Sequence, residues 1–297
     1  MDLNIFNIIK TKISSSVKNK SKSKFIQPHK IVEKFALQLL LTGHCNTACY
    51  GCAVFSPLAK ETYMNLELIE KALLRMHELA SEEVESVNLT GGEPMLHPKL
   101  NLFFGLVRRI FPATRIHLCT NGILILKSGD EFWKEMRVNK IILTPTKYPN
   151  MPWHDIEKKA KKEDVMLEYY GMEYDNKGKM LPKTSQKRTL DPTGNQPAGN
   201  GNNCWRILAK SYNFTLREDG KLFRCSQIAT IHYFNEYFNQ NFEVCEGDFV
   251  NIYKVDNFDS IMDYVSNPLP FCRYCDLKSI KWDLPYHKSK REISEWI

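Results

Sequence analysis

Short apolar runs alternate with stretches of helical periodicity between residues 35 and 170. Runs typical of buried strands lie at 35–42, 87–90, 115–119, 140–144 and 165–170. Helical patterns separate them, following the N-capping residue Asn65 and then at about 98–111, 130–136 and 153–162. Such strict alternation predicts an α/β fold in which about five to six parallel strands form a partial (β/α) barrel.

Unusual polar residues follow four of these strands. Three closely spaced cysteines come after the first strand, Gly91-Gly92-Glu93-Pro94 after the second, Asn121 after the third and Thr144 to Lys147 after the fourth. In parallel sheets and barrels, ligands bind at the carboxyl ends of the strands. The sequence therefore predicts that these segments meet at one mouth.

The cysteines after the first strand are Cys45, Cys49 and Cys52, in a C-x3-C-x2-C arrangement. A 4Fe-4S cluster takes a ligand on each iron, so three cysteines leave one iron open to a non-protein ligand. A structural zinc would require four protein ligands, with a second Cys or His pair about 12 to 20 residues further on. That window contains no such pair.

This arrangement resembles the cluster loop of the radical S-adenosylmethionine (radical SAM) enzymes. The resemblance implies that the open iron holds the amino and carboxylate groups of SAM, and that reductive cleavage of SAM yields a 5'-deoxyadenosyl radical. The commonest form of the loop has an aromatic residue before the third cysteine, where this chain has Gly51 preceded by Tyr50. Phe55 could supply an aromatic face for the adenine instead.

The same resemblance suggests roles for further residues. Gly91, Gly92, Glu93 and Pro94 resemble the family's GGE motif, whose backbone and carboxylate hold the methionine ammonium of SAM. Asn121 is either a polar contact to SAM or a loop-stabilising Asx turn. Thr144 is similar in position to residues that touch SAM's ribose or carboxylate. Lys147 is a candidate base for a departing substrate proton, or a solvated loop lysine.

A second group of cysteines follows an irregular segment rich in Gly, Asn and Pro. Cys204, Cys225, Cys272 and Cys275 resemble the ligands of the auxiliary-cluster domain of radical SAM enzymes, called twitch or SPASM, which implies a second 4Fe-4S cluster. Four thiolates also suit a structural zinc. Cys245 fits neither group and could be a core residue, a substitute ligand or a hydrogen-atom donor. Cys119 is expected to be buried in a strand.

The expected organisation has four parts. A basic tail at 1–34 precedes a radical SAM core at 35–174, a linker or active-site loop at 175–203 and a small cysteine-rich auxiliary-cluster domain at 204–297. The tail contains eight Lys against Asp2 and Glu33, which accounts for most of the net charge of +7, and the nearly neutral remainder gives no reason to expect nucleic acid. The tail is either solvated or an amphipathic helix on an anionic membrane surface.

The absence of a secretory signal, together with nine cysteines, favours a reduced, cytoplasmic protein that binds metal over a disulfide framework. The resemblance implies an oxidoreductase that removes a hydrogen atom from a small polar substrate, such as a sugar or cyclitol, with the second cluster accepting an electron. A flavodoxin- or ferredoxin-like protein would supply the reducing electron. The alternatives are a peptide-modifying maturase, or an epimerase with a cysteine hydrogen donor.

Overall fold

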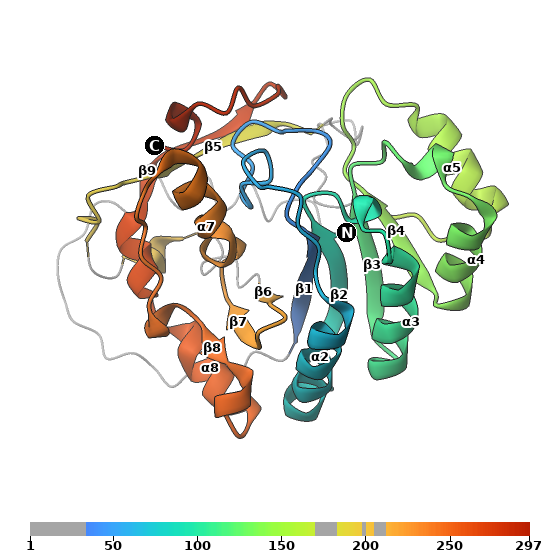
Figure 1. Ribbon diagram of the computed structural model, residues 1–297, viewed down its shortest axis with the longest axis horizontal. Coiled ribbons are helices and arrows are strands. Elements are labelled where there is room, and N and C mark those ends of the chain that lie inside the picture. The colour runs from blue at the N-terminus through green and yellow to red at the C-terminus, as the bar shows by residue number, and fades with distance from the viewer. Residues whose placement is uncertain (1–33, 170–182, 198–199, 205–211) are drawn as a thin grey trace, which may run out of the picture. The chain divides into compact units, whose positions relative to one another are not determined.

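The computed structural model describes residues 34–169, 183–197, 200–204 and 212–297 (Figure 1), which belong to one compact unit of the chain. Apart from Lys34, the expected basic tail lies outside these residues, so its proposed membrane contact stays a prediction. Within the described residues, none of the helices has the length and apolar character needed to cross a membrane.

Two sheets are present in the described part of the chain. A seven-stranded sheet has the order β4-β3-β2-β1-β6-β7-β8, and β5 pairs with β9 in a two-stranded antiparallel sheet. The strands are β1 (Phe35–Thr42), β2 (Val84–Gly91), β3 (Arg115–Thr120), β4 (Ile141–Pro145), β5 (Ser185–Leu190), β6 (Asn213–Leu216), β7 (Lys221–Phe223), β8 (Val250–Asn251) and β9 (Cys275–Leu284). The five strands from β4 to β6 in this order are parallel, whereas β7 and β8 are antiparallel to their neighbours. The sheet is therefore a mostly parallel, partial barrel.

Four helices connect the parallel strands and pack on one face of the sheet, and Figure 1 shows α2 and α3 in front of β1 to β3. These four are α2 (Leu66–Ala80), α3 (Leu100–Ile110), α4 (Asp130–Val138) and α5 (Trp153–Lys162); two further helices, α7 (Ser226–Phe238) and α8 (Phe258–Ser266), come after β7 and β8. Asn65 caps α2 as expected, because its side-chain oxygen accepts from the backbone N–H groups of Glu67 and Leu68. Burial of one apolar stripe on each helix holds it to the strands.

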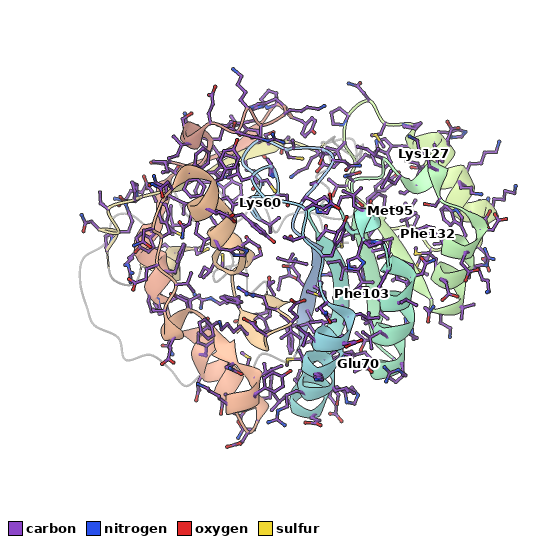
Figure 2. All side chains as sticks on the ribbon, in the orientation of Figure 1. Lys60, Glu70, Met95, Phe103, Lys127 and Phe132 are labelled. Atoms are coloured by element: carbon purple, nitrogen blue, oxygen red, sulfur yellow. The ribbon has the colours of Figure 1, made fainter. Side chains whose placement is uncertain are left out.

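The two faces of the sheet differ in character. On β1, Leu37, Leu39 and Leu41 are fully buried against the helices, and Phe103 of α3, labelled in Figure 2, is equally buried in this core. Side chains alternate across a strand, so the intervening residues face the inside of the barrel. There Gln38 is half-buried and bonds to Thr215 of β6. The inner face is thus partly polar and partly accessible.

Two features of the sheet differ from the sequence expectation. The strand expected at 165–170 is reduced to a single parallel bridge between Leu143 and Leu167, flanked by Asp164 in the left-handed backbone region. The fifth parallel partner is instead β6, which lies beside β1 although more than 170 residues separate them in sequence. Strands from the region expected to form a separate auxiliary domain therefore continue the core sheet.

Candidate functional site

The cysteine loop, residues 43–58, connects the end of β1 to the segment before α2. Cys45, Cys49 and Cys52 all line one cavity of about 210 Å³ at the carboxyl ends of β1, β2 and β3. The hydroxyl oxygen of Thr47 lies 3.0 Å from Cys45 Sγ and accepts a hydrogen bond from Cys49 Sγ at 3.5 Å. The structure therefore brings the three predicted cluster ligands together, as the spacing indicated.

The chemistry of these thiols fits a metal cluster. Burial raises the pKa of the Cys52 thiol to about 11 and also raises the pKa of Cys45. Without metal both sulfurs keep their protons at neutral pH, and a positively charged ligand is needed to stabilise the buried thiolates. Within the described residues, no three His, Cys, Asp or Glu side chains lie close enough to hold one metal ion. A cubane cluster is bound differently, because each thiolate takes a separate iron.

The Gly91-Gly92 turn is fastened to the start of the cysteine loop. Gly92 N–H donates to Thr42 O at 2.8 Å, and Glu93 N–H donates to His44 O at 3.0 Å. A Cβ at position 92 would lie 1.9 Å from His44 O, so only glycine permits this approach. Both glycines line the cavity. The turn and the first cysteine are consequently held in a fixed relation.

The Glu93 side chain is buried beside this cavity and ties the ends of two strands together. Its Oε1 accepts from Met95 N–H at 3.0 Å and from the Thr120 hydroxyl at 2.7 Å, and its Oε2 accepts from Asn121 N–H at 2.8 Å. Burial raises the pKa of Glu93 to about 7, although these three donors oppose the shift. Glu93 and Pro94 are not among the described residues that line the cavity, so the carboxylate has a structural role that the motif did not indicate.

Asn121 forms an Asx turn at the end of β3 and also lines the cavity. Its Oδ1 accepts from Ile123 N–H at 3.0 Å, while its Nδ2 donates to Asn46 Oδ1 at 2.6 Å and contacts Cys45 Sγ at 3.8 Å. The side chain therefore joins the third strand to the cysteine loop. Of the two roles considered from the sequence, the Asx turn is present, and the contact to SAM stays a prediction.

The structure does not bring Thr144 or Lys147 to the cavity. The Thr144 hydroxyl lies 3.0 Å from His117 Nδ1, on the inner face of the sheet below the cavity. The Lys147 ammonium lies 4.8 Å from the centre of the Tyr169 ring. The roles suggested for these two residues stay predictions. Neither lines the cavity itself, although Thr144 pairs with the cavity-lining Cys119 in the sheet and Lys147 lies between the lining residues Thr146 and Tyr148.

The unusual Gly51 has a structural cause. A Cβ at this position would lie 1.8 Å from Gln186 O of β5, and the backbone φ of +61° also favours glycine. The strand β5 thus occupies the space where an aromatic side chain would stand. Phe55 does not replace it, because Phe55 is fully buried against Phe234 and Trp296 in a second hydrophobic core. The expectation that Phe55 faces the adenine is wrong.

Three residues near the cysteines were missed as site residues. Cys119 on β3 and Tyr148 after β4 both line the cavity, and burial raises the pKa of the Cys119 thiol to about 12. Tyr286, from the C-terminal end of the chain, contacts Cys49 Sγ at 3.9 Å. Tyr148 follows a strand end as Lys147 does, so its position was a usable signal. Nothing local in the sequence marked Tyr286.

Three cysteines of the second group, Cys204, Cys225 and Cys272, lie near one another. The charges of Cys204 and Cys225 both act on Cys272, and burial raises the pKa of the Cys272 thiol. Cys275 is linked to Cys272 through Asn200, whose Nδ2 donates to Cys275 O at 2.6 Å and to Cys272 O at 3.5 Å. Cys225 stands at the N-cap of α7, where the helix dipole favours a negatively charged ligand sulfur. The closed second cluster expected from these four cysteines stays a prediction.

Cys245 is held apart from that group by a local contact. It begins the 3-10 helix at Glu246–Asp248, and its Sγ donates to Asp248 Oδ2 at 3.3 Å. Asp248 Oδ1 in turn accepts from Phe271 N–H at 2.7 Å. Cys245 is not among the described residues that line the cavity at the first cysteine group. Its thiol therefore belongs to a capping arrangement.

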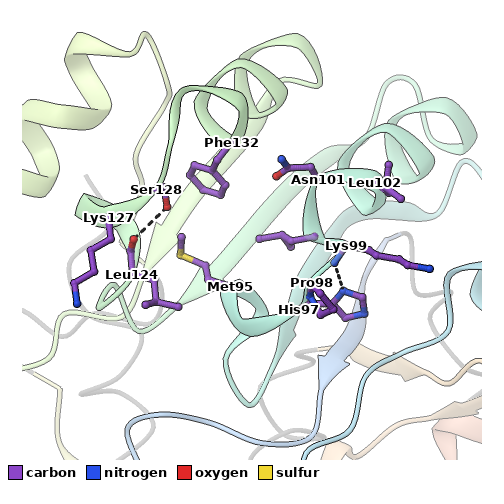
Figure 3. Close-up of a pocket in the computed structure, with 11 residues that line it drawn as sticks. Met95, His97, Pro98, Lys99, Asn101, Leu102, Leu124, Lys127, Ser128 and Phe132 are labelled. Carbon is purple, nitrogen blue, oxygen red and sulfur yellow. Dashed lines mark hydrogen bonds between the residues drawn. The ribbon is translucent and has the colours of Figure 1, made fainter.

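A larger cavity of about 450 Å³ lies on the other side of the Glu93 turn, between the beginnings of α3 and α4 (Figure 3). Met95, Leu124 and Phe132 give it an apolar wall, and the exposed Lys99 and Lys127 lie at its edge. The residues that line it include no cysteine. Size alone therefore does not identify the reactive site in this protein.

Residues 39–164 match the model of the Radical SAM superfamily, so this part of the chain is a radical SAM domain. The match includes Cys45, Cys49, Cys52 and the Gly91-Gly92-Glu93-Pro94 turn. It confirms the family indicated by the cysteine spacing.

Among particular relatives, the chain is similar to the GTP 3',8-cyclase of Campylobacter curvus, with 29% identity over 89 residues, which is 30% of this chain and 28% of that protein. It is also similar to the GTP 3',8-cyclase of a Sulfurovum species, with 30% identity over 95 residues, or 32% and 29% of the two chains. The matched segment thus spans less than a third of these relatives.

Two solved structures are also similar to the chain. One is BtrN in complex with AdoMet and 2-DOIA, with a TM-score of 0.47 and 15% identity over 83% of this chain and 94% of that chain. The other is anSMEcpe with bound AdoMet, with a TM-score of 0.45 and 15% identity over 82% and 83% of the two chains.

Proposed function

We propose that the chain is a radical SAM enzyme that abstracts a hydrogen atom from a small polar substrate, in a net oxidation that uses a second cluster. The observation that carries this proposal is the convergence of Cys45, Cys49 and Cys52 on one cavity with the Gly91-Gly92 turn and Asn121. A 4Fe-4S cluster held there would supply the electron that cleaves SAM. A one-electron carrier of the flavodoxin or ferredoxin kind would supply that electron.

The Glu93 turn suits the methionine end of SAM. A carboxylate has about four lone-pair positions, and three are used by the donors from Met95, Thr120 and Asn121. Gly91 and Gly92 of this turn line the cavity and would meet the methionine end of SAM, and the buried carboxylate behind them would attract its ammonium. An ammonium would also favour ionised Glu93, whose pKa burial otherwise raises to about 7.

The polarity of the inner sheet face supports a small polar substrate. Gln38 and Cys119 line the cavity, and His117 lies on the same face of β3 two residues before Cys119. Burial lowers the pKa of His117, so its ring is neutral at pH 7 and can exchange hydrogen bonds with a hydroxyl group. A cavity wall that contains an amide and a thiol, with an imidazole on the adjoining sheet face, favours hydroxyl- or amine-bearing molecules, as in sugars and cyclitols.

Oxidation of the substrate radical requires an electron acceptor. The second cysteine group, Cys204, Cys225, Cys272 and Cys275, offers four thiol ligands and would hold a closed cluster suited to this role. A closed cluster has no open iron, so it takes up an electron without binding the substrate. The expected metal content is about eight irons per chain.

The test is anaerobic reconstitution with iron and sulfide, followed by incubation with SAM and dithionite and measurement of 5'-deoxyadenosine. We expect 5'-deoxyadenosine from the wild-type chain and a loss of at least about 100-fold in Cys49→Ala. Cys245→Ser is the matched control, because this thiol lies in the capping arrangement with Asp248. A loaded wild-type chain that forms no 5'-deoxyadenosine would refute the proposal.

Epimerisation is a second candidate function, favoured by the place of Cys119. This thiol lines the cavity, whereas Cys245 does not, and burial keeps Cys119 protonated as a hydrogen-atom donor must be. In D2O the thiol of Cys119 exchanges its hydrogen for deuterium, so an epimerase would place deuterium in its product. Cys119→Ala would abolish this labelling, while 5'-deoxyadenosine would still form. Equal deuterium in both proteins would exclude Cys119 as the donor.

A further inference from the structure

The last residues of the chain, 285–297, lie across the cysteine loop, and we call them the C-terminal strap. Tyr50 N–H donates to His287 O at 3.2 Å, and Ser289 N–H donates to Ala48 O at 2.8 Å. Cys49 itself forms an antiparallel bridge with Lys288. The backbone of the cluster loop is therefore paired with a segment almost 240 residues away in sequence.

Further contacts hold the strap in place. Trp296 is almost fully buried, and its Nε1–H donates to Cys52 O at 3.3 Å. Leu190 N–H also donates to Trp296 O, which joins the strap to β5. Two of the three predicted ligands, Cys49 and Cys52, thus have backbone contacts with the strap.

The strap brings the phenol of Tyr286 to the sulfur of Cys49, where it lies beside a second phenol, that of Tyr148. Tyr286 OH lies 3.9 Å from Cys49 Sγ, and Tyr148 OH lies 3.2 Å from the same atom. The two rings meet edge to face with centroids 5.0 Å apart. Trp153 Nε1–H donates to Tyr148 O at 2.8 Å and fixes the backbone at that position.

A metal-bound thiolate has no proton to give, so each phenol must be the donor once Cys49 binds iron. A phenol has an ordinary pKa of about 10, so both side chains have a proton to donate at neutral pH. Hydrogen bonds to ligand sulfur stabilise the more negative, reduced state of a cluster more than its oxidised state. This is a recognised control of cluster reduction potential.

We propose that Tyr148 and Tyr286 are positioning residues that donate hydrogen bonds to the Cys49 thiolate and raise the reduction potential of the first cluster. The C-terminal strap is the element that supplies the second of these donors. The inference rests on the proposed function, because it concerns the cluster assigned to Cys45, Cys49 and Cys52.

The test is a redox titration of the reconstituted chain. The electron paramagnetic resonance signal of the reduced first cluster is measured at each applied potential. Every sample also carries Cys225→Ala. This substitution removes the signal of the second cluster, so that the measured signal comes from the first cluster. Tyr148→Phe should lower the potential by about 59 mV, which corresponds to a tenfold change in a one-electron equilibrium. Tyr286→Phe should lower it less, because its oxygen lies further from the sulfur.

Tyr50→Phe is the matched control. Its ring packs on His287 of the same strap, with centroids 4.2 Å apart, but its phenol makes neither of the two contacts to Cys49 Sγ. We expect its potential to equal that of the parent. Phenylalanine keeps the ring packing, so a change confined to Tyr148→Phe and Tyr286→Phe reports the lost hydroxyl.

The outcomes separate the two proposals. Equal potentials in the parent, Tyr148→Phe and Tyr286→Phe would refute this inference while leaving the proposed function intact. A chain that loads the cluster and shows the shifts, but forms no 5'-deoxyadenosine, would refute the proposed function alone. A parent chain that binds no cluster through Cys45, Cys49 and Cys52 would refute both.

Discussion

Substitution of the buried Glu93 by glutamine should change how the free energy of unfolding depends on pH. Burial raises the pKa of this carboxyl from 4.5 to about 7. In the unfolded chain Glu93 releases its proton near its ordinary pKa, whereas the folded chain keeps the proton until about pH 7. Between these values the folded state binds one more proton than the unfolded state.

The sign follows from proton linkage. Because the folded state binds the extra proton, this group's contribution to stability is fully present below about pH 4.5 and is lost as the pH rises to about 7. The slope is about 1.4 kcal/mol per pH unit, so the whole interval amounts to about 3 kcal/mol. Above about pH 7 both states are ionised and the contribution stays constant.

Urea unfolding measures this effect. The free energy of unfolding is determined for the metal-free wild type and for Glu93→Gln at several pH values between about 5 and about 8. Other titrating groups are common to both proteins and cancel in the difference. Glutamine also places an N–H group against one of the three donors, which costs about 1–3 kcal/mol at every pH. That offset shifts the difference without changing its slope.

We expect the stability of the wild type relative to Glu93→Gln to fall by about 2 to 3 kcal/mol between about pH 5 and about pH 7 and then to level off. A difference that stays constant over this range would mean that Glu93 ionises near its ordinary pKa. The three hydrogen-bond donors would then outweigh burial, and the account of this residue would be wrong.

Three further predictions concern the same centres. Gly51→Ala should lower iron binding at the first group severalfold, because its Cβ would lie 1.8 Å from a carbonyl oxygen of β5, whereas Gly129→Ala, with nothing within 4 Å, should bind iron as the wild type does. Cys225→Ala should reduce iron from about eight to about four per chain, and Cys245→Ser should leave it unchanged; equal losses would show that Cys245 is a ligand. The dissociation constant of SAM, measured by equilibrium dialysis with the loaded protein, should decrease as the pH rises through about 7, because ionised Glu93 attracts the ammonium; an increase would contradict that role.

Local features of the sequence predicted much of the fold. The N-cap at Asn65 and the helix at Trp153–Lys162 appear where the pattern placed them, because side-chain capping and an apolar stripe act over a few residues. The convergence of the three cysteines, Gly91-Gly92 and Asn121 also followed from strand order alone. Each of these depends on short-range periodicity or on the rule that parallel strands point the same way.

The parts that could not be predicted depend on contacts between distant segments. The pairing of β6 with β1 and the contact of Tyr286 with Cys49 join residues more than 170 positions apart, and no local pattern encodes such pairs. The aromatic role expected of Phe55 was wrong because the second core, which buries it, is built mainly from residues after 220. The structural role of Glu93 could not be seen until its three donors were placed.

One strand links the two cysteine groups directly. β9 begins at Cys275 and ends at Leu284, two residues before Tyr286, and its antiparallel pairing with β5 holds it along most of this length. Metal bound at Cys275, where β9 begins, would anchor the C-terminal strap that lies across the first cysteine group. If both cysteine groups bind iron as proposed, the order of insertion would matter, because a chain that first binds iron at Cys275 would already hold the C-terminal strap over Cys49 when the first cluster is assembled.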